Sequence, residues 1–152
     1  MKKTFTIVKV MIAAIALFAV SSMQAADQCS KVVDVMCNAF QQMADEANKC
    51  TSLEQLTTLD FDSVATNVNA DDIPDSCLQY KLNASDKKRL KASIDNFSNS
   101  LVNKMYDLSG GIISKQYIQQ QMDVEMSKFK KAVDNAVTFE DFVNNVSVVS
   151  ND

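Results

Sequence analysis

The sequence contains no histidine and no tryptophan, and only two glycines and one proline among its 152 residues. Without histidine, any catalytic or metal site that depends on an imidazole is excluded. The shortage of glycine and proline disfavours folds with many tight turns, because these residues supply the backbone angles that most turns need. β-Sandwiches and β-barrels need a turn about every 8 to 12 residues, so they fit the sequence poorly. Long helices fit it well.

The N-terminus has the pattern of a secretory signal peptide. Lys2, Lys3 and Lys9 precede an apolar run of eleven residues from 10 to 20, and an uncharged stretch follows up to Ala26. A helix that crosses a bilayer needs about 20 apolar residues, so a permanent anchor is the weaker interpretation. Two residues separate Ala26 from Cys29, which disfavours a lipid anchor on that cysteine.

We predict that residues 1–25 are a removed leader, with the cut between 22 and 26, and that residues 26–152 form a single exported domain. Such a domain is periplasmic or secreted, and after cleavage it has no membrane span. The leader takes three of the fifteen basic residues with it, so twelve remain against nineteen acids, a net charge of −7. Because nucleic acid binding depends on lysine and arginine neutralising phosphates, nucleic acid is excluded as a partner.

Apolar residues recur three and four positions apart in three long stretches, which is the spacing of one face of a helix. We predict helices over residues 30–49, 85–108 and 113–137, the second capped by Ser85 and stopped by Gly110 and Gly111. A short last helix begins at Thr138, which forms a capping box with Asp141. The predicted fold is an all-α, antiparallel bundle of three long amphipathic helices with short closing helices, stapled by disulfides.

The stretch from 51 to 83 lacks a long periodic pattern. Ser52 with Gln55 resembles a capping box, Asp62 is placed to cap a turn, and Pro74 suits the first turn of a short helix. The acids at 60–62 and 69–75 lack the loop spacing and the central glycine of a calcium site. Capping and solvation explain them better.

Four cysteines in an exported chain indicate two disulfides. Cys29, Cys37, Cys50 and Cys77 allow three pairings, and if helix 30–49 continued through Cys29, that residue would lie about 12 Å from Cys37 and 31 Å from Cys50. A disulfide tolerates about 7 Å between Cα atoms. We therefore predict that Cys29 folds back onto Cys37, and that Cys50 at the helix end meets Cys77. Zinc and thiol catalysis are disfavoured because closely spaced cysteine pairs and histidines are absent.

A basic cluster lies in the first turns of the second helix, where the helix dipole disfavours it. Its members, Lys87, Lys88, Arg89 and Lys91, are predicted contacts for a protein partner. The alternative is that they lie on a solvated face or complement the acidic first half of the same molecule.

No spacing nominates catalytic residues, metal ligands or a cofactor, so no enzymatic activity is predicted. The function that we expect is that of a soluble binding or structural protein of the cell envelope, with a protein partner. The alternative is a carrier of small apolar ligands, because five methionines lie on the apolar stripes and could line an adaptable pocket. These are Met36, Met43, Met105, Met122 and Met126.

Overall fold

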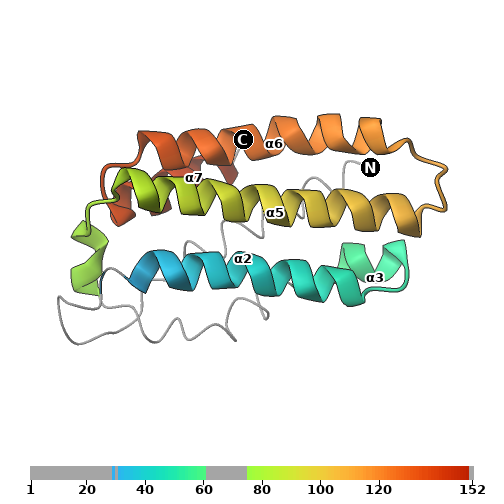
Figure 1. The fold of residues 1–152 in the computed structure, drawn as a ribbon, viewed down its shortest axis with the longest axis horizontal. Coiled ribbons are helices and arrows are strands. Elements are labelled where there is room, and N and C mark those ends of the chain that lie inside the picture. The colour runs from blue at the N-terminus through green and yellow to red at the C-terminus, as the bar shows by residue number, and fades with distance from the viewer. Residues whose placement is uncertain (1–28, 30, 61–74, 151–152) are drawn as a thin grey trace.

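The computed structural model describes residues 29, 31–60 and 75–150, and it is mostly helical, as predicted (Figure 1). The elements in chain order are α2 (Val32–Lys49), α3 (Leu53–Thr58), the 3-10 helix η3 (Asp75–Gln79), α5 (Ala84–Leu108), α6 (Lys115–Asn135) and α7 (Phe139–Ser150). Among the described residues β pairing is confined to one isolated antiparallel bridge between Lys81 and Thr138. The predicted leader, the turn at Asp62 and Pro74 lie outside the described residues.

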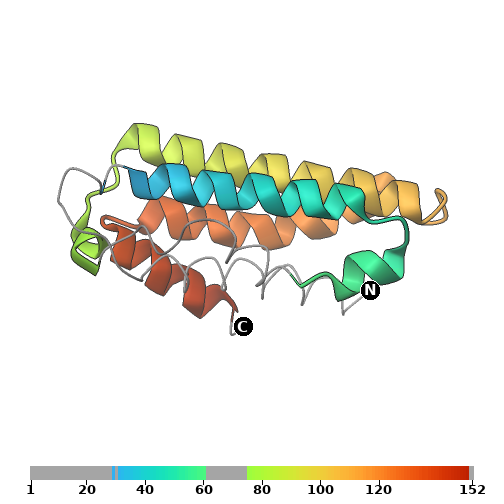
Figure 2. The same ribbon diagram turned by 90° about the horizontal axis from the view of Figure 1, so that it is seen from below.

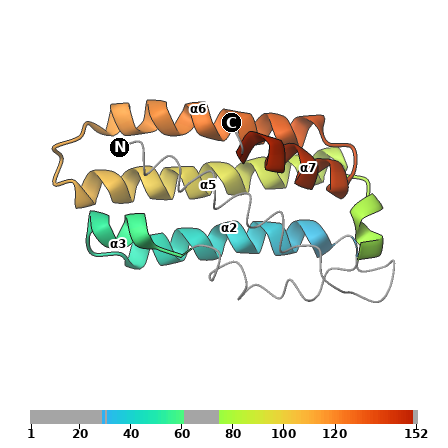
Figure 3. The same ribbon diagram turned by 180° about the vertical axis from the view of Figure 1, so that it is seen from behind.

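The long helix α5 lies between α2 and α6, and the three form one layer (Figure 1). The short helices α3 and α7 lie on the same face of this layer (Figures 2 and 3). α5 and α6 are antiparallel, because Lys91 near the start of α5 binds Asp134 near the end of α6, at 2.6 Å. The predicted helical hairpin over these two helices is therefore present.

The prediction that the first long helix is antiparallel to the second is wrong, because α2 and α5 run in the same direction. Asp34 and Arg89, both near the N-terminal ends of their helices, form an ion pair. Farther along, the rings of Phe40 and Phe97 lie 6.1 Å apart. Near the C-terminal ends, Lys104 donates a hydrogen bond to the backbone carbonyl of Asn48 at 2.6 Å. The end of α2 and the start of α5 therefore lie at opposite ends of the bundle.

The helix ends follow local capping chemistry, with one correction. α5 is capped by Asn83 and not by Ser85: the Asn83 side chain accepts from the N–H of Asp86, and the Asp86 carboxylate accepts from the N–H of Asn83. Asparagine is as good a cap as serine. Asp86 is buried, and a helix that begins after Asn83 gives its carboxylate the N–H of Asn83 as a hydrogen-bond donor. At the other end, Gly110 and Gly111 have φ values of 62° and 76°, the left-handed region predicted for them.

The predicted capping box at the start of α7 is confirmed. The N–H of Asp141 donates to the Thr138 hydroxyl at 3.2 Å, and the Asp141 carboxylate accepts from the N–H groups of Thr138 and Val137 at 2.8 and 3.0 Å. These two backbone donors lower the pKa of Asp141 below its ordinary value, since they stabilise the charged form. The Ser52 cap of α3 also accepts from the N–H of Gln55, as predicted.

The lowered pKa of Asp141 predicts a pH-dependent contribution to stability. The contribution is present above the pKa of Asp141 in the unfolded chain and is lost as pH falls through the lower native value. We expect Asp141→Asn to be less stable than the wild type at neutral pH, with a difference that shrinks below about pH 4. Urea denaturation at both pH values measures this. Asp107→Asn is the control, because the Asp107 side chain makes no hydrogen bond to a described residue; an equal pH dependence in both variants would contradict the prediction.

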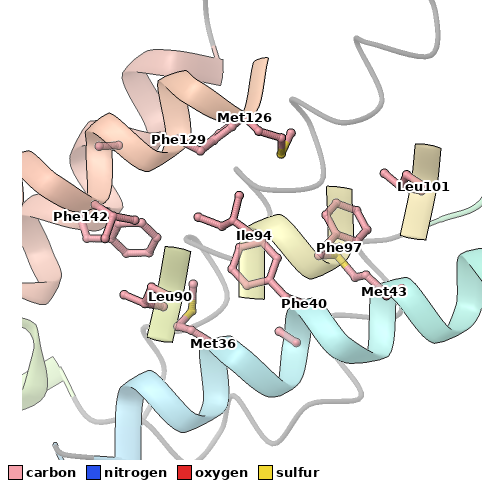
Figure 4. Packing of buried hydrophobic residues seen from close by; sticks show 14 of the residues in the cluster. Met36, Phe40, Met43, Leu90, Ile94, Phe97, Leu101, Met126, Phe129 and Phe142 are labelled. Carbon is pink, nitrogen blue, oxygen red and sulfur yellow. The ribbon is translucent and has the colours of Figure 1, made fainter. Parts of the chain in front are cut away.

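The core lies where the predicted apolar stripes of α2, α5, α6 and α7 meet (Figure 4). Phe40, Phe97, Phe129 and Phe142 are all at most 1% exposed. Figure 4 shows Phe40 of α2 beside Phe97 of α5, and Phe142 of α7 among the labelled core side chains. Each long helix contributes one face to this core, which is what the three- and four-residue spacing predicts.

Candidate functional site

The predicted cysteine pairing is wrong. The structure joins Cys29 to Cys77, with their Cα atoms 5.0 Å apart, and leaves Cys37 and Cys50 as free thiols. Both free cysteines belong to α2: Cys37 lies within the helix and Cys50 is its C-cap. At about 1.5 Å of rise per residue, their separation along the axis is near 20 Å, so they cannot pair with each other.

The pairing follows from the parallel direction of α2 and α5. Cys29 comes just before α2, and Cys77 lies in η3, just before α5. Because the two helices begin at the same end of the bundle, the residues that precede them meet there. In an antiparallel pair the end of α2 would instead lie beside the start of α5, and Cys50 would be the neighbour of Cys77.

The two free thiols differ in their surroundings. Cys50 is buried, at 6% exposure, and its thiol donates to the backbone carbonyl of Glu46, with sulfur and oxygen 3.6 Å apart. Cys37 is partly exposed and lines a groove on the surface. Cys37 is therefore the thiol that solvent and reagents can reach.

Three of the four residues in the predicted basic contact have partners within the molecule. Arg89 pairs with Asp34, which raises the pKa of Arg89 by hydrogen bonding and by charge. Lys91 pairs with the Asp134 carboxylate, and Lys87 donates to the Asp134 backbone carbonyl at 2.8 Å. Only the Arg89–Asp34 pair supports the alternative in which the cluster complements the acidic first half of the molecule, because Asp134 lies in the second half.

Lys88 is the remaining member of this cluster. It is exposed, and its side chain makes no hydrogen bond or ion pair with any described residue. The partner contact at the basic cluster stays a prediction, and Lys88 is the part of it that is available to another molecule.

A groove runs along the surface between α2 and α5, and we call it the α2–α5 groove. Its volume is about 160 Å³. Five of its lining side chains are amides or hydroxyls: Gln41, Asn48, Ser93, Asn96 and Ser100. Ala44 and Cys37 also line it, and Phe40 and Phe97 lie beneath. On each helix the lining residues recur three or four positions apart, so they lie on one face. The lining faces of the two helices look toward each other along the groove.

Non-covalent side-chain contacts between the two helices flank the α2–α5 groove. At one end Arg89 pairs with Asp34, and at the other Lys104 binds the carbonyl of Asn48. No aspartate, glutamate, lysine or arginine is among the described residues that line the groove itself. The groove is therefore a neutral, polar surface held between two rigid helices.

An exposed apolar cluster lies at the turn between α5 and α6, and we call it the hairpin tip. Ile112 is 91% exposed there, and Tyr106 and Tyr117 are 37% and 40% exposed. The Tyr106 hydroxyl lies close to Gly111. Next to Ile112, Ile113 packs against the core and holds the turn in place. The tip presents one large, exposed aliphatic side chain, and the helix on each side of the turn carries one partly exposed tyrosine.

Sequence reasoning missed both of these surfaces. For the hairpin tip a signal was available, because Ile112 follows the glycine pair and precedes the predicted stripe of the next helix. For the groove there was no equivalent signal, because its two walls come from residues about 50 positions apart. Only the pairing of α2 with α5 brings those walls together.

The five methionines all lie in the core, at 7% exposure or less. None of them lines the α2–α5 groove. The predicted apolar ligand cavity among them stays a prediction. Within the described part of the chain there is no group of three or more cysteine, aspartate or glutamate residues placed to hold a metal ion. In the same part no helix has both the length and the hydropathy to cross a membrane.

Comparisons with known proteins add no relative to this picture. No protein-family model matches the chain, and searches of curated proteins and of solved structures find no significant match.

Proposed function

We propose that this chain is an exported helical binding protein of the cell envelope, without catalytic activity, that contacts a protein partner through the hairpin tip. The observation that carries the proposal is the exposure of Ile112 at the turn, with Tyr106 and Tyr117 partly exposed in the two helices that the turn joins. Burying an isoleucine side chain is worth about 1.5 to 3 kcal/mol. Tyrosines are enriched where proteins meet, because each offers a large rigid ring and a polar hydroxyl.

The Cys29–Cys77 disulfide supports the exported location, because disulfides form and persist in oxidising compartments. It agrees with the leader predicted for residues 1–25. The packing of α5 against α6 supports the contact, since a tip held by two packed helices loses little conformational freedom on binding.

Cross-linking tests the contact. A photoreactive amino acid at position 112 is expected to give a discrete protein adduct in the envelope of cells that produce the protein. The same residue at position 131, an exposed site near the other end of α6, is the control and is expected to give no such adduct. Identical adducts from both positions would contradict a contact at the tip.

A matched pair of variants measures the strength of the contact. Ile112→Ser is expected to weaken partner binding about tenfold or more, which corresponds to the lost burial of the aliphatic side chain. Val124→Ser is the control, because Val124 is an exposed aliphatic residue in α6 at 57% exposure. Both variants should unfold within about 0.5 kcal/mol of the wild type. Equal binding by the two variants would exclude the tip.

The predicted basic contact is tested separately through Lys88→Glu. Reversing Arg89 or Lys91 would break an ion pair inside the molecule, so their variants confuse binding with stability. If Lys88→Glu reduces recovery of the partner at unchanged melting temperature, the basic cluster belongs to the interface. If recovery is unchanged, the cluster serves only the fold.

A further inference from the structure

We propose that the α2–α5 groove binds a neutral sugar ring. The groove is separate from the hairpin tip, and the proposal goes beyond the protein contact made there. It rests on the chemistry of the lining side chains, on the absence of charge among them, and on the size of the space.

The hydrogen-bonding groups of the groove are available to a ligand. The side chains of Asn48, Ser93, Asn96 and Ser100 make no hydrogen bond to any described residue. Amides and hydroxyls both donate and accept, and so do the hydroxyl groups of a sugar. These side chains belong to two helices that contact each other through an ion pair at one end of the groove and a hydrogen bond at the other. The distances between the side chains are therefore fixed before a ligand binds.

The described residues that line the groove include no charged side chain, and this selects a neutral ligand. An ion that entered the groove would lose water without gaining a counter-charge, which is unfavourable. At one end of the groove Arg89 is paired with Asp34. At the other end Lys104 is bound to the carbonyl of Asn48. Phosphates, carboxylates and amines are therefore poor candidates, and polyhydroxylated neutral molecules are good ones.

The volume suits a ligand of one ring. A cavity of about 150 Å³ holds a single six-membered ring, and the groove measures about 160 Å³. Phe40, Phe97 and Ala44 supply apolar atoms beneath and beside the polar groups. A pyranose ring presents C–H groups on its faces and hydroxyls around its edge, so it matches this arrangement. A bound peptide would need backbone partners or deeper apolar pockets, which this lining does not supply.

Cys37 offers a built-in reporter of occupancy, because it lines the groove and Cys50 does not. The experiment measures alkylation of both thiols by iodoacetamide in the disulfide-intact mature protein. The added probes are glucose, galactose, mannose or N-acetylglucosamine at about 50 mM, since one ring is expected to bind in the millimolar range. At least one neutral sugar is expected to slow the reaction of Cys37 about fivefold, with no effect on Cys50. Amide chemical shifts of α2 and α5, followed by NMR in the same titration, give a second readout that does not depend on the thiol.

Matched variants locate the binding. Asn96→Leu removes an amide and fills the groove, and it is expected to abolish the protection of Cys37. Asn103→Leu, at an exposed position of α5 that does not line the groove, should leave the protection unchanged. Equal protection in both variants would place the sugar elsewhere and overturn the proposal.

Two further probes separate the ligand classes. Glucuronic acid should not protect Cys37, and protection by it equal to that by glucose would refute selection for a neutral ligand. If N-acetylalanine amide protects Cys37 and no sugar does, the groove is a peptide site and the proposal is wrong. It is also overturned if no sugar changes either the alkylation rate or the amide shifts. All of these outcomes are independent of the hairpin tip, because Ile112 is intact throughout.

Discussion

Replacing Cys29 and Cys77 together by alanine is expected to lower the free energy of unfolding by about 4 kcal/mol. The disulfide spans 48 residues of sequence, and the chain-entropy estimate for closing a loop of that length gives about this value. The loss is large compared with the total stability of about 5 to 15 kcal/mol that is usual for one domain. Urea denaturation of the variant and of the wild type, analysed with a common slope, measures the difference.

Reduction supplies the control for this prediction. A reducing agent should destabilise the wild type by a similar amount and leave the double variant unchanged, because the variant has no disulfide to lose. Cys50→Ala should cost about 1 kcal/mol or less, since it removes one small buried group and no cross-link. If Cys50→Ala and Cys77→Ala destabilise equally, and a non-reducing peptide map finds these two residues linked, the Cys29–Cys77 pairing is wrong.

Truncating Phe97 to alanine is expected to destabilise the protein by about 3 to 5 kcal/mol. Phe97 has no exposed surface and lies against Phe40, so its removal leaves a cavity between α2 and α5. The neighbouring side chains are themselves closely packed and cannot fill the space fully. Thermal and urea denaturation both measure the loss.

Two comparisons make the Phe97 result specific. Tyr106→Ala removes a ring of similar size from an exposed position of the same helix, and it should change stability much less than Phe97→Ala. A double-mutant cycle with Phe40→Ala and Phe97→Ala should show coupling, because the two rings are in contact. Additive losses would mean that α2 and α5 do not meet at these residues, and the parallel arrangement would then be in doubt.

The apolar spacing of the sequence determined the helices. Apolar residues at three- and four-residue intervals fall on one face only when the chain is helical, and that face can then be buried. The short connection between α5 and α6 determined their antiparallel direction. Only residues 109–114 join these helices, and a connection this short can reach only the near end of the next helix. The capping box at Thr138 and Asp141 was equally local, since both partners lie within one turn.

The tertiary structure alone decided the direction of α2 against α5. A stripe reports which face of a helix is buried, but it does not report which helix covers that face or in which direction. Residues 50–83 are long enough to join the end of α2 to either end of α5, so the sequence left both arrangements open. The parallel arrangement placed Cys29 beside Cys77 and built the two walls of the α2–α5 groove. The disulfide and the groove were therefore beyond local patterns, because each depends on contacts between residues about 50 positions apart.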